Sequence, residues 1–591
     1  MPESNSDILN TAGILWNLND LYSATSDSNL EQDIKWCKTE AAEIKKIFAG
    51  NIARIKTTDL FSLVSRLEKL DSTLGKISTF AFLNFATKTK DAAAGAFLQE
   101  IKETGSMIGK EVIFFELEWS KTDDASADRL MKDEKLSHYR HYLSNMRRYA
   151  KHLLSHAEET LLLERAPVGR SSWNNLFDKV MGYMKFGESE RTEEEVLADL
   201  YNQDQDVRRQ AAKELTDGLK SQLHVLTHIF NTILADKMID DRIRSYGSWV
   251  SSMNLYNELQ DKTVEVLVDA VTSRYDIPQR YYRLKKQLTG LPELKDYDRY
   301  APLPHLSAQT IPWQECQTMV LEAFDRFSPQ MADTAKLFFD RNWIHAPIIE
   351  GKRGGAFAHP CVPEVHPYVM VNYTGNLRDV STVAHELGHG VHQYLAAAGG
   401  YYNSNTTLVL AETASVFGEL ILFNAQVDRL QSPEEKRAFV CQKLESIFAT
   451  VFRQVSMNRF ENLIHNTRRD KGELSSDDFA THWLTTQNAM FGDSVNLTED
   501  YGIWWSYIPH FLSTPGYVYS YAFGELLVLA LYNLYQQDPV SFVPKYINLL
   551  KSGGSNSPYE LLKPFKVDLD DRNFWDGGLQ TIDDMLKTVE I

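Results

Sequence analysis

Apolar residues recur at three- and four-residue spacings along most of this 591-residue chain, which is the period of amphipathic helices. The pattern is clearest in residues 60–85, 92–118, 207–238 and 525–552. Prolines fall mostly between such segments, and the chain shows no low-complexity tract or short repeat that would indicate a solenoid. The periodicity therefore predicts a mainly α fold.

One zone departs from the helical pattern. Residues 343–375 read WIHAPIIEGKRGGAFAHPCVPEVHPYVMVNYTG, with glycines, prolines and runs of β-branched or aromatic residues. IHAPII (344–349) and HPYVMVNY (366–373) are predicted to be short strands joined by a glycine-rich turn. GKRGGA (351–356) lacks the GxxxxGK[ST] spacing of a phosphate-binding loop, so a hairpin connection is the preferred interpretation. The sequence thus predicts a small sheet immediately before the next helix.

The chain is too long for one simple hydrophobic core, which predicts two or more domains or lobes. A strongly polar stretch, ESERTEEEVLADLYNQDQD (188–206), is the best candidate for a boundary. We expect an N-terminal helical domain over residues 1–200 and a catalytic domain over residues 201–591. Residues 302–313, PLPHLSAQTIPW, are predicted to form a long internal loop.

Charge and cysteine content indicate which partners and which cell compartment to expect. Lys and Arg number 62 against 80 Asp and Glu, a net charge of −18, and phosphate binding needs clustered cations, so no nucleic-acid partner is expected. The N-terminus shows no basic stretch followed by an apolar run, and the longest apolar patch, LLVLALY (526–532), is too short to span a bilayer. The cysteines, Cys37, Cys316, Cys361 and Cys441, are scattered without a CxxC pair. These features predict a cytoplasmic protein without a membrane anchor or disulfide framework.

Two histidines and a glutamate form the first chemical motif, AHELGHGVH (384–392). The segment 379–397 is compatible with a helix, on which His385 and His389 would lie on one face and could bind one Zn²⁺. Glu386 lies beside that face, where it could take a proton from an activated water. The alternative is an ordinary helix with two buried, hydrogen-bonded histidines.

A third protein ligand would strengthen the zinc hypothesis, and the chain offers two sources. His392 is the first, but the pattern HExxHxxGxxH fails here, because His392 occupies the glycine position and Leu395 the last histidine position. The second is LVLAETASVFGEL (408–420), where Glu412 and Glu419 lie seven residues apart on one face of a predicted helix. If this helix packs antiparallel on the first, Glu412 could reach the ion and Glu419 could orient a ligand imidazole. The alternative is that both glutamates are solvated.

A cluster of aromatic residues follows further along the chain. Residues 508–525, IPHFLSTPGYVYSYAFGE, contain His510, Tyr517, Tyr519 and Tyr521 around a Pro-Gly turn. Water attack on an amide creates an oxyanion, which neutral N–H and O–H donors stabilise in a dry site. A flexible turn would allow these donors to close on a substrate. The alternative is that the tyrosines are ordinary packing residues.

Taken together, HELGH, AETASVFGE and HFLSTPGYVYSYA resemble the M3 zinc metallopeptidases, specifically the oligoendopeptidase F type. GKRGGAF and PYVMVNYTGNLRDV match the same family before the motif helix, and GRSSWNNLFDKVMGYMKF (169–186) resembles its N-terminal domain. The similarity covers most of the chain. The resemblance implies a mainly α, two-lobed helical ellipsoid with a deep substrate channel and a small β-sheet beside the zinc helix.

The resemblance also implies roles for single residues near the motif. The family's zinc ligands fall on His385, His389 and Glu412, and its catalytic glutamate falls on Glu386. NYTG (372–375) is similar to the edge strand that aligns a substrate's backbone in this family.

The donors that stabilise the family's transition state fall on His510 and Tyr521, with Tyr517 as their partner. The thimet-type relatives have a longer glycine-rich stretch with another tyrosine at this point, whereas residues 513–516 here read STPG. Whether Tyr517 or Tyr519 assists Tyr521 is therefore left open.

The resulting hypothesis is a zinc-dependent endopeptidase that binds one Zn²⁺ per chain and hydrolyses internal bonds of short, unfolded peptides. One alternative is a zinc carboxypeptidase of similar helical fold, which would need a group such as Arg353 to bind the substrate's terminal carboxylate. The other is a peptide-binding protein without catalytic activity. Glu386 weighs against the second alternative, because a purely structural metal site has no use for it.

Overall fold

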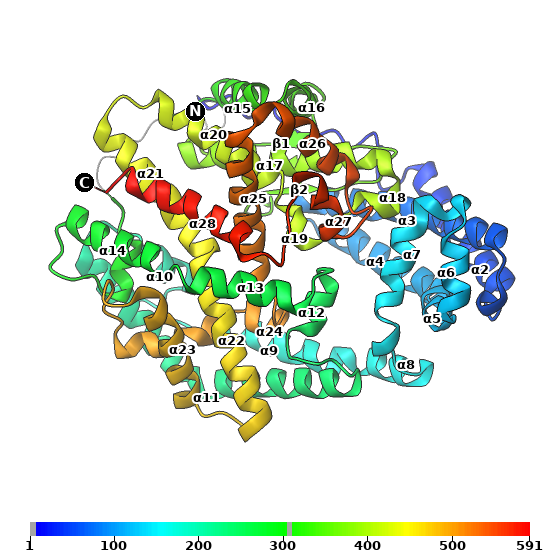
Figure 1. The fold of residues 1–591 in the computed structure, drawn as a ribbon, viewed down its shortest axis with the longest axis horizontal. Coiled ribbons are helices and arrows are strands. Elements are labelled where there is room, and N and C mark those ends of the chain that lie inside the picture. Colours follow the sequence, from blue (N-terminus) through cyan, green and yellow to red (C-terminus); the bar gives the residue numbers. More distant parts are fainter. Residues whose placement is uncertain (1–7, 304–309, 591) are drawn as a thin grey trace. The chain divides into compact units, whose positions relative to one another are not determined.

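A computed structural model describes residues 8–303 and 310–590 (Figure 1). The chain forms two compact units, each assembled from three separate segments. The first unit comprises Met1–Ala150, Ala308–Arg429 and Leu534–Val567, and the second comprises Lys151–Ser307, Leu430–Asn533 and Asp568–Ile591. Sequential domains of residues 1–200 and 201–591 stay a prediction. Of the loop predicted at 302–313, residues 304–309 lie outside the described residues.

The first unit combines helices with the sheet. Its α-helices and strands are α2 Ser28–Phe48, α3 Thr57–Ala86, α4 Ala92–Val112, α5 Phe114–Lys121, α6 Asp124–Met131, α7 Arg140–Arg148, α15 Trp313–Phe327, α16 Pro329–Asp340, β1 Ile344–His345, β2 Phe357–His359, β3 Tyr368–Met370, α17 Leu377–Ala396, α18 Tyr401–Ser404, α19 Leu408–Ala411, α20 Ser415–Arg429, α26 Pro539–Ser552 and α27 Pro558–Leu562. Its 3₁₀ helices are η1 Ile52–Arg54, η2 Glu134–Tyr139, η6 Ala397–Gly399 and η8 Lys563–Phe565.

The regular structure of the second unit, within the described residues, is helical. Its α-helices are α8 His156–Arg165, α9 Arg170–Tyr183, α10 Glu193–Asp199, α11 Gln205–Ile243, α12 Ser251–Tyr256, α13 Asp261–Thr272, α14 Asp276–Thr289, α21 Pro433–Thr450, α22 Phe452–Lys471, α23 Ser476–Phe491, α24 His510–Ser513 and α28 Arg572–Lys587. Its 3₁₀ helices are η4 Ala166–Val168, η5 Asp296–Tyr300 and η7 Glu499–Tyr507. Two of the divisions between the units fall within helices, in η3 Ala150–His152 and α25 Tyr519–Gln537.

The predicted mainly α fold is confirmed, and the helices coincide with the apolar periodicity. Residues 60–85 lie in α3 and residues 207–238 in α11. The pattern at 525–552 is broken into α25 and α26, because Pro539 cannot continue a helix and Asp538 caps the next one by accepting a hydrogen bond from Ser541 N at 3.2 Å.

The small sheet has the strand order β1-β3-β2. The two predicted strands do pair, but β1 runs parallel to β3, with Ile344 opposite Val369, so the glycine-rich segment 351–356 is not the hairpin connection that was predicted. The antiparallel partner of β3 is β2, with Ala358 opposite Val369. Strand β2 was missed because its three residues, between a glycine-rich loop and a proline, are too few to show alternation.

Residues 372–375 do not form the edge strand that the family resemblance implied. Their backbone is not assigned to a strand, and Tyr373 N donates to Ala346 O at 3.1 Å. The Asn372 side chain donates to the carbonyls of Arg353 and Gly355 at 3.0 and 2.8 Å. The strand at the edge of the sheet beside α17 is instead β2, where Gln393 Nε2 donates to Ala358 O at 3.5 Å.

Each unit has its own buried core. In the first, helices α2 to α7 pack around residues such as Phe80 and Trp119. In the second, α9, α11, α22, α23 and η7 pack around aromatic residues, with Phe230 and Trp505 ring centroids 4.7 Å apart. Two independent cores account for the division into two compact units.

The stretch Leu408–Arg429, which spans α19 and α20, is by length and composition apolar enough to cross a membrane. However, 67% of its most apolar window is buried inside the fold. A core helix that packs on all sides has the same composition as a membrane span, so this feature is explained by packing. None of the four cysteines forms a disulfide, in agreement with the sequence prediction.

Candidate metal centre and active site

Helix α17 positions the HExxH motif. Asn376 and Asp379 form a capping box at its start, which satisfies the first free backbone N–H groups. One stripe of the helix is buried at helical spacing, through Val380, Val383, Ala384, Leu387 and Val391. The motif residues lie on this firmly packed helix, which limits their movement.

Glycines allow the backbone of α17 to approach the segment that carries Glu412. A Cβ at Gly388 would lie 2.4 Å from Ala414 O, and a Cβ at Gly418 would lie 3.4 Å from Ala384 O. Ala384 lies beside Gly418 and Gly388 lies beside Ala414, so residue numbers increase along one element and decrease along the other. The two elements therefore run antiparallel, the condition under which Glu412 could reach the ion, at a separation that only small residues permit.

The second helix is not continuous, contrary to the prediction for residues 408–420. Helix α19 ends at Ala411 and α20 begins at Ser415, which leaves Glu412 in the turn between them. The break is held from a distant part of the chain, since Tyr546 in α26 donates its phenolic proton to Thr413 O at 2.6 Å. This turn aims Glu412 at α17.

Three side chains converge on one point. Glu412 Oε2 lies 3.5 Å from His385 Nε2 and 3.4 Å from His389 Nε2, and the three ligand atoms all lie within 4.8 Å of one another. Tetrahedral ligands at 2.0–2.1 Å from a zinc ion are themselves about 3.4 Å apart. The donor set, two imidazole nitrogens and one carboxylate oxygen at this spacing, fits a divalent metal ion. His392 is outside this group, in the buried interior.

Each of these side chains is held by a second group. His385 Nδ1 lies 3.4 Å from Glu419 Oε2, which leaves Nε2 as the nitrogen that faces Glu412. The backbone carbonyl of Ala411 is a hydrogen-bond partner of His389. Ser415 Oγ donates to Glu412 Oε2 at 2.5 Å. Such contacts fix ring orientation and carboxylate rotamer before a metal arrives.

Charge is concentrated at this centre. Burial lowers the pKa of His385, but the hydrogen bond to Glu419 and the charge of Glu412 outweigh burial and raise that pKa to about 9. Burial lowers the pKa of His389 to about 4. Burial raises the pKa of Glu412, yet the two imidazoles and Ser415 bring it below its ordinary value. The centre therefore keeps an ionised carboxylate available for a cation.

Glu386 lies next to the centre in a drier environment. Its side chain is 7% exposed, and burial raises its pKa to about 7, partly offset by the charge of His385. The backbone N–H of Ala358 in β2 is its hydrogen-bond partner. A carboxylate with a pKa near neutrality is well matched to take up and release a proton.

The second unit groups three of the predicted donors. His510 Nε2 and Tyr521 OH are 3.3 Å apart, and the Tyr517 and Tyr521 rings meet edge to face at a centroid distance of 4.8 Å. All three side chains are partly exposed. Burial and the positive charge of Arg453 lower the pKa of His510, which keeps the imidazole neutral and able to donate.

Tyr519 points elsewhere. It is fully buried, and its hydroxyl accepts a hydrogen bond from Asn257 Nδ2 at 2.9 Å. The structure therefore groups Tyr517, and not Tyr519, with Tyr521. Sequence reasoning missed the group that holds this segment, the buried Glu461, whose Oε1 accepts from Gly516 N at 2.8 Å.

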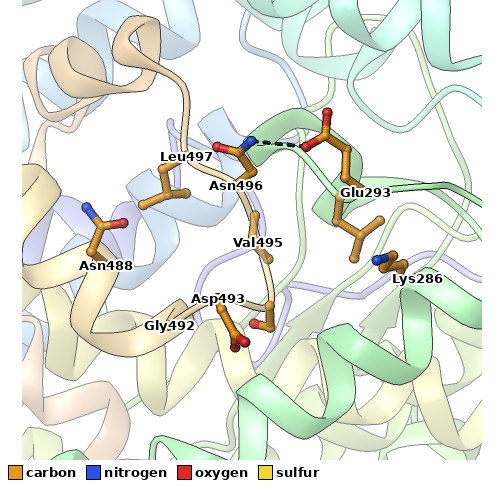
Figure 2. A pocket seen from close by; sticks show the side chains of 10 residues that line it. Lys286, Glu293, Asn488, Gly492, Asp493, Val495, Asn496 and Leu497 are labelled. Atoms are coloured by element: carbon orange, nitrogen blue, oxygen red, sulfur yellow. Dashed lines mark hydrogen bonds between the residues drawn. The ribbon is translucent and has the colours of Figure 1, made fainter.

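Two other features of the molecule, a hollow and an exposed arginine, lack the groups that the metal centre has. A hollow of about 430 Å³ in the second unit is lined by residues 492–497 together with Lys286, Glu293, Leu294 and Asn488 (Figure 2). Its carboxylates are already paired, Glu293 with Asn496 and Lys295, and Asp493 with Arg283. Arg353 is an exposed cation over the Phe82 ring, with 5.7 Å between the guanidinium carbon and the ring centroid. Neither feature contains hydrolytic groups.

Comparison with known proteins gives matches to peptidases along most of the chain. A family model described as peptidase family M3 matches residues 199–581, and one described as oligopeptidase F matches residues 118–186. Oligopeptidase PepF of Bacillus subtilis is 25% identical over 572 residues, covering 94% of this chain and 83% of the relative. An oligoendopeptidase F homolog of Lactococcus lactis is 23% identical over 590 residues, covering 98% and 97%.

Solved structures share the fold over essentially the whole chain. A structure titled as a putative peptidase from Chlamydophila abortus matches with a TM-score of 0.86 at 22% identity, covering 100% of this chain and 98% of that one. Oligoendopeptidase-F from Enterococcus faecium matches with a TM-score of 0.69 at 20% identity, covering 95% and 97%.

Proposed function

Because the chain belongs to peptidase family M3, we propose that it is a zinc-dependent endopeptidase that hydrolyses internal bonds of short, unfolded peptides. One observation carries the proposal: each of two imidazole nitrogens lies 3.4 to 3.5 Å from one carboxylate oxygen, which matches the ligand spacing of a tetrahedral zinc site. Family membership supports a metallopeptidase. Beyond that, we propose that the metal ion is zinc, that cleavage is internal to the peptide, and that the protein is cytoplasmic.

His385, His389 and Glu412 would hold the metal ion. A bound Zn²⁺ would polarise the scissile carbonyl and lower the pKa of a water molecule in its open position. Glu386 takes the proton from the attacking water, since its pKa near 7 makes the carboxylate a base of suitable strength. It then gives the same proton to the leaving amine.

His510 and Tyr521 supply hydrogen-bond donors to the oxyanion that develops on the former carbonyl oxygen, and Tyr517 supports the orientation of Tyr521. Removing one such donor costs about 10²–10³ in kcat in other hydrolases, so these residues affect the rate more than substrate binding.

The test compares the zinc-loaded wild type with Glu386→Gln at matched metal content, on a quenched library of short peptides analysed by mass spectrometry. We expect internal cleavage by the wild type and its loss in the variant, because glutamine cannot accept the proton. Equal cleavage by both proteins would refute the role of Glu386. Removal of only C-terminal residues by the wild type would replace the proposal with a carboxypeptidase, and binding without cleavage would replace it with a peptide-binding protein.

A further inference from the structure

Two arginines in the second unit lack carboxylate partners. Arg299 in η5 is 5% exposed, and Arg453 in the first turn of α22 is partly exposed. Within the described residues, no carboxylate oxygen lies within 4.0 Å of either guanidinium. Other arginines of the unit are paired, such as Arg208 with Asp298 at 2.8 Å and Arg280 with Asp583 at 2.6 Å.

Tyrosines stabilise Arg299 in the absence of a counter-ion. Its Nη1 donates to Tyr501 OH at 2.8 Å and its Nη2 donates to Tyr300 OH at 2.6 Å. Its guanidinium carbon also lies 4.5 Å from the centroid of the Tyr300 ring and 4.9 Å from that of Tyr501. Cation–π contacts and neutral hydrogen bonds allow a buried guanidinium to remain charged. The negative charge that would normally neutralise it is missing.

Two carboxylates of the same region are engaged with other groups. Glu445 Oε1 accepts hydrogen bonds from Tyr281 OH and from Lys285 Nζ, the latter at 2.6 Å. Asp296 Oδ1 accepts from Thr498 N at 2.9 Å. Neither forms an ion pair with the two arginines. An anion from outside the chain would therefore meet positive charge that no carboxylate of the described residues pairs with directly.

Arg453 presents the accessible part of this cluster. It makes no hydrogen bond or ion pair with the described residues, although its charge acts on Arg299, Tyr300 and Tyr507. Tyr300 and Tyr507 are partly exposed like Arg453, whereas Arg299 lies buried behind them. The positive charge lowers the pKa of Tyr300 despite its burial. The cluster thus combines a buried cation, Arg299, with a partly exposed arginine, Arg453, that forms no ion pair within the described residues.

The cluster also adjoins the proposed oxyanion donors. The charge of Arg453 contributes to the lowered pKa of His510, and Tyr507 precedes His510 by only three residues. An anion held by Arg453 would therefore belong to the same substrate that His510 contacts. In a peptide, the anion with the planar geometry that a guanidinium binds in a bidentate manner is a carboxylate.

We propose that Arg453, backed by Arg299, binds a carboxylate of the peptide substrate and makes the protein select for peptides that carry one. This inference rests on the proposed function, since it places the site on the substrate of the peptidase. The carboxylate is either the free C-terminus or an Asp or Glu side chain. Arg453 is a specificity residue in this proposal and takes no part in proton transfer.

The experiment uses three quenched peptides of one sequence: a C-terminal acid, its C-terminal amide, and the amide with one Gln→Glu substitution. We expect the zinc-loaded wild type to favour a carboxylate-bearing peptide over the amide by about 10- to 100-fold in kcat/KM, mainly through KM. Arg453→Met should remove the preference, so that this variant cleaves the acid, the amide and the Glu peptide with similar kcat/KM. Arg453→Lys should restore part of it, since lysine keeps the charge without the fork.

Arg459→Met is the matched control, because Arg459 is an exposed arginine on the same helix α22, and it should keep the wild-type preference. If the wild type prefers only the acid over the amide, the site binds the terminal carboxylate. If it prefers the Glu peptide over the amide to the same extent, the site accepts a side-chain carboxylate. Thermal melts establish that each variant is folded. A preference that survives Arg453→Met, or its absence from the wild type, overturns the inference.

Binding separates this inference from the proposed function. Affinities of the same peptides for Glu386→Gln, with and without Arg453→Met, are measured by fluorescence polarisation without turnover. If the wild type cleaves nothing but binding still depends on the carboxylate and on Arg453, the proposed function fails and the carboxylate site stands. If neither the acid nor the Glu peptide binds more tightly than the plain amide, the site is refuted even when cleavage is observed.

Discussion

Gly388 offers a way to perturb the metal centre without touching a ligand. A Cβ at this position would lie 2.4 Å from Ala414 O and 2.5 Å from Ser415 Cα, both backbone atoms that cannot rotate away. An ordinary contact is about 3.4 Å or longer, so Gly388→Ala requires the two elements to separate by about 1 Å. Metal–ligand distances tolerate changes of only about 0.2 Å, and Glu412 lies three residues before Ser415.

We therefore expect Gly388→Ala to weaken zinc binding by about 10- to 100-fold, the range found when the supports of a metal ligand are removed. Overpacking should also lower the free energy of unfolding by about 1–3 kcal/mol. Zinc affinity is measured by competition with a chromophoric chelator, and stability by urea denaturation of the metal-free protein.

Gly390→Ala is the matched control on the same helix. Its Cβ would lie 2.7 Å from Phe338 Cε1, an atom of a side-chain ring that can move. This variant should lose stability but keep zinc affinity within about threefold, because no backbone near Glu412 is displaced. Gly388→Ala with wild-type zinc affinity would show that the close approach of the helices does not position Glu412.

Three further predictions concern single side chains. Glu419→Gln should weaken zinc affinity by about 10- to 100-fold while the ligands remain, because His385 Nδ1 loses its charged partner; unchanged affinity would contradict the orienting role. Tyr521→Phe should lower kcat by about 100-fold with little change in KM, because it removes an oxyanion donor. Tyr519→Phe should chiefly lower thermal stability, because it removes the hydrogen bond to Asn257. The reverse result would exchange the roles of the two tyrosines. Burial raises the pKa of Glu461 to about 8, so the folded protein binds more protons than the unfolded chain between about pH 4.5 and 8, and stability should fall as pH rises through that window. Urea midpoints from pH 5 to 9 should show this loss, at most about 5 kcal/mol, in the wild type and not in Glu461→Gln, and parallel curves would refute it.

The helical part of the site was predictable because its signals are local. The HExxH spacing and the helix periodicity depend on residues within a turn or two of one another. The choice between Tyr517 and Tyr519 was not local, because Tyr517 precedes the start of α25 at Tyr519 and helix periodicity does not reach it. The contacts of the two rings decide it: Tyr517 meets Tyr521, and Tyr519 is held by Asn257.

The remaining features depend on distant contacts. The break after Ala411 is held by Tyr546, 133 residues further along the chain, and nothing near residue 412 predicts it. The three residues of strand β2 carry no periodic signal of their own. They form a strand because they pair with β3. The pairing of Glu461 with Gly516 spans 55 residues. Such contacts are set by tertiary packing, which overrides local propensity.

The assembly of the first unit from three segments has a consequence for biosynthesis. The motif helix and Glu412 belong to the middle segment, but the hydroxyl that holds the turn beside Glu412 comes from the last, Leu534–Val567. A ribosome must therefore synthesise the segment Leu534–Val567 before this unit can close. We expect shorter nascent chains and truncated products to carry the HExxH sequence without the turn that aims Glu412 at it. The order of segments in the gene thus delays completion of the site until long after its motif helix has been synthesised.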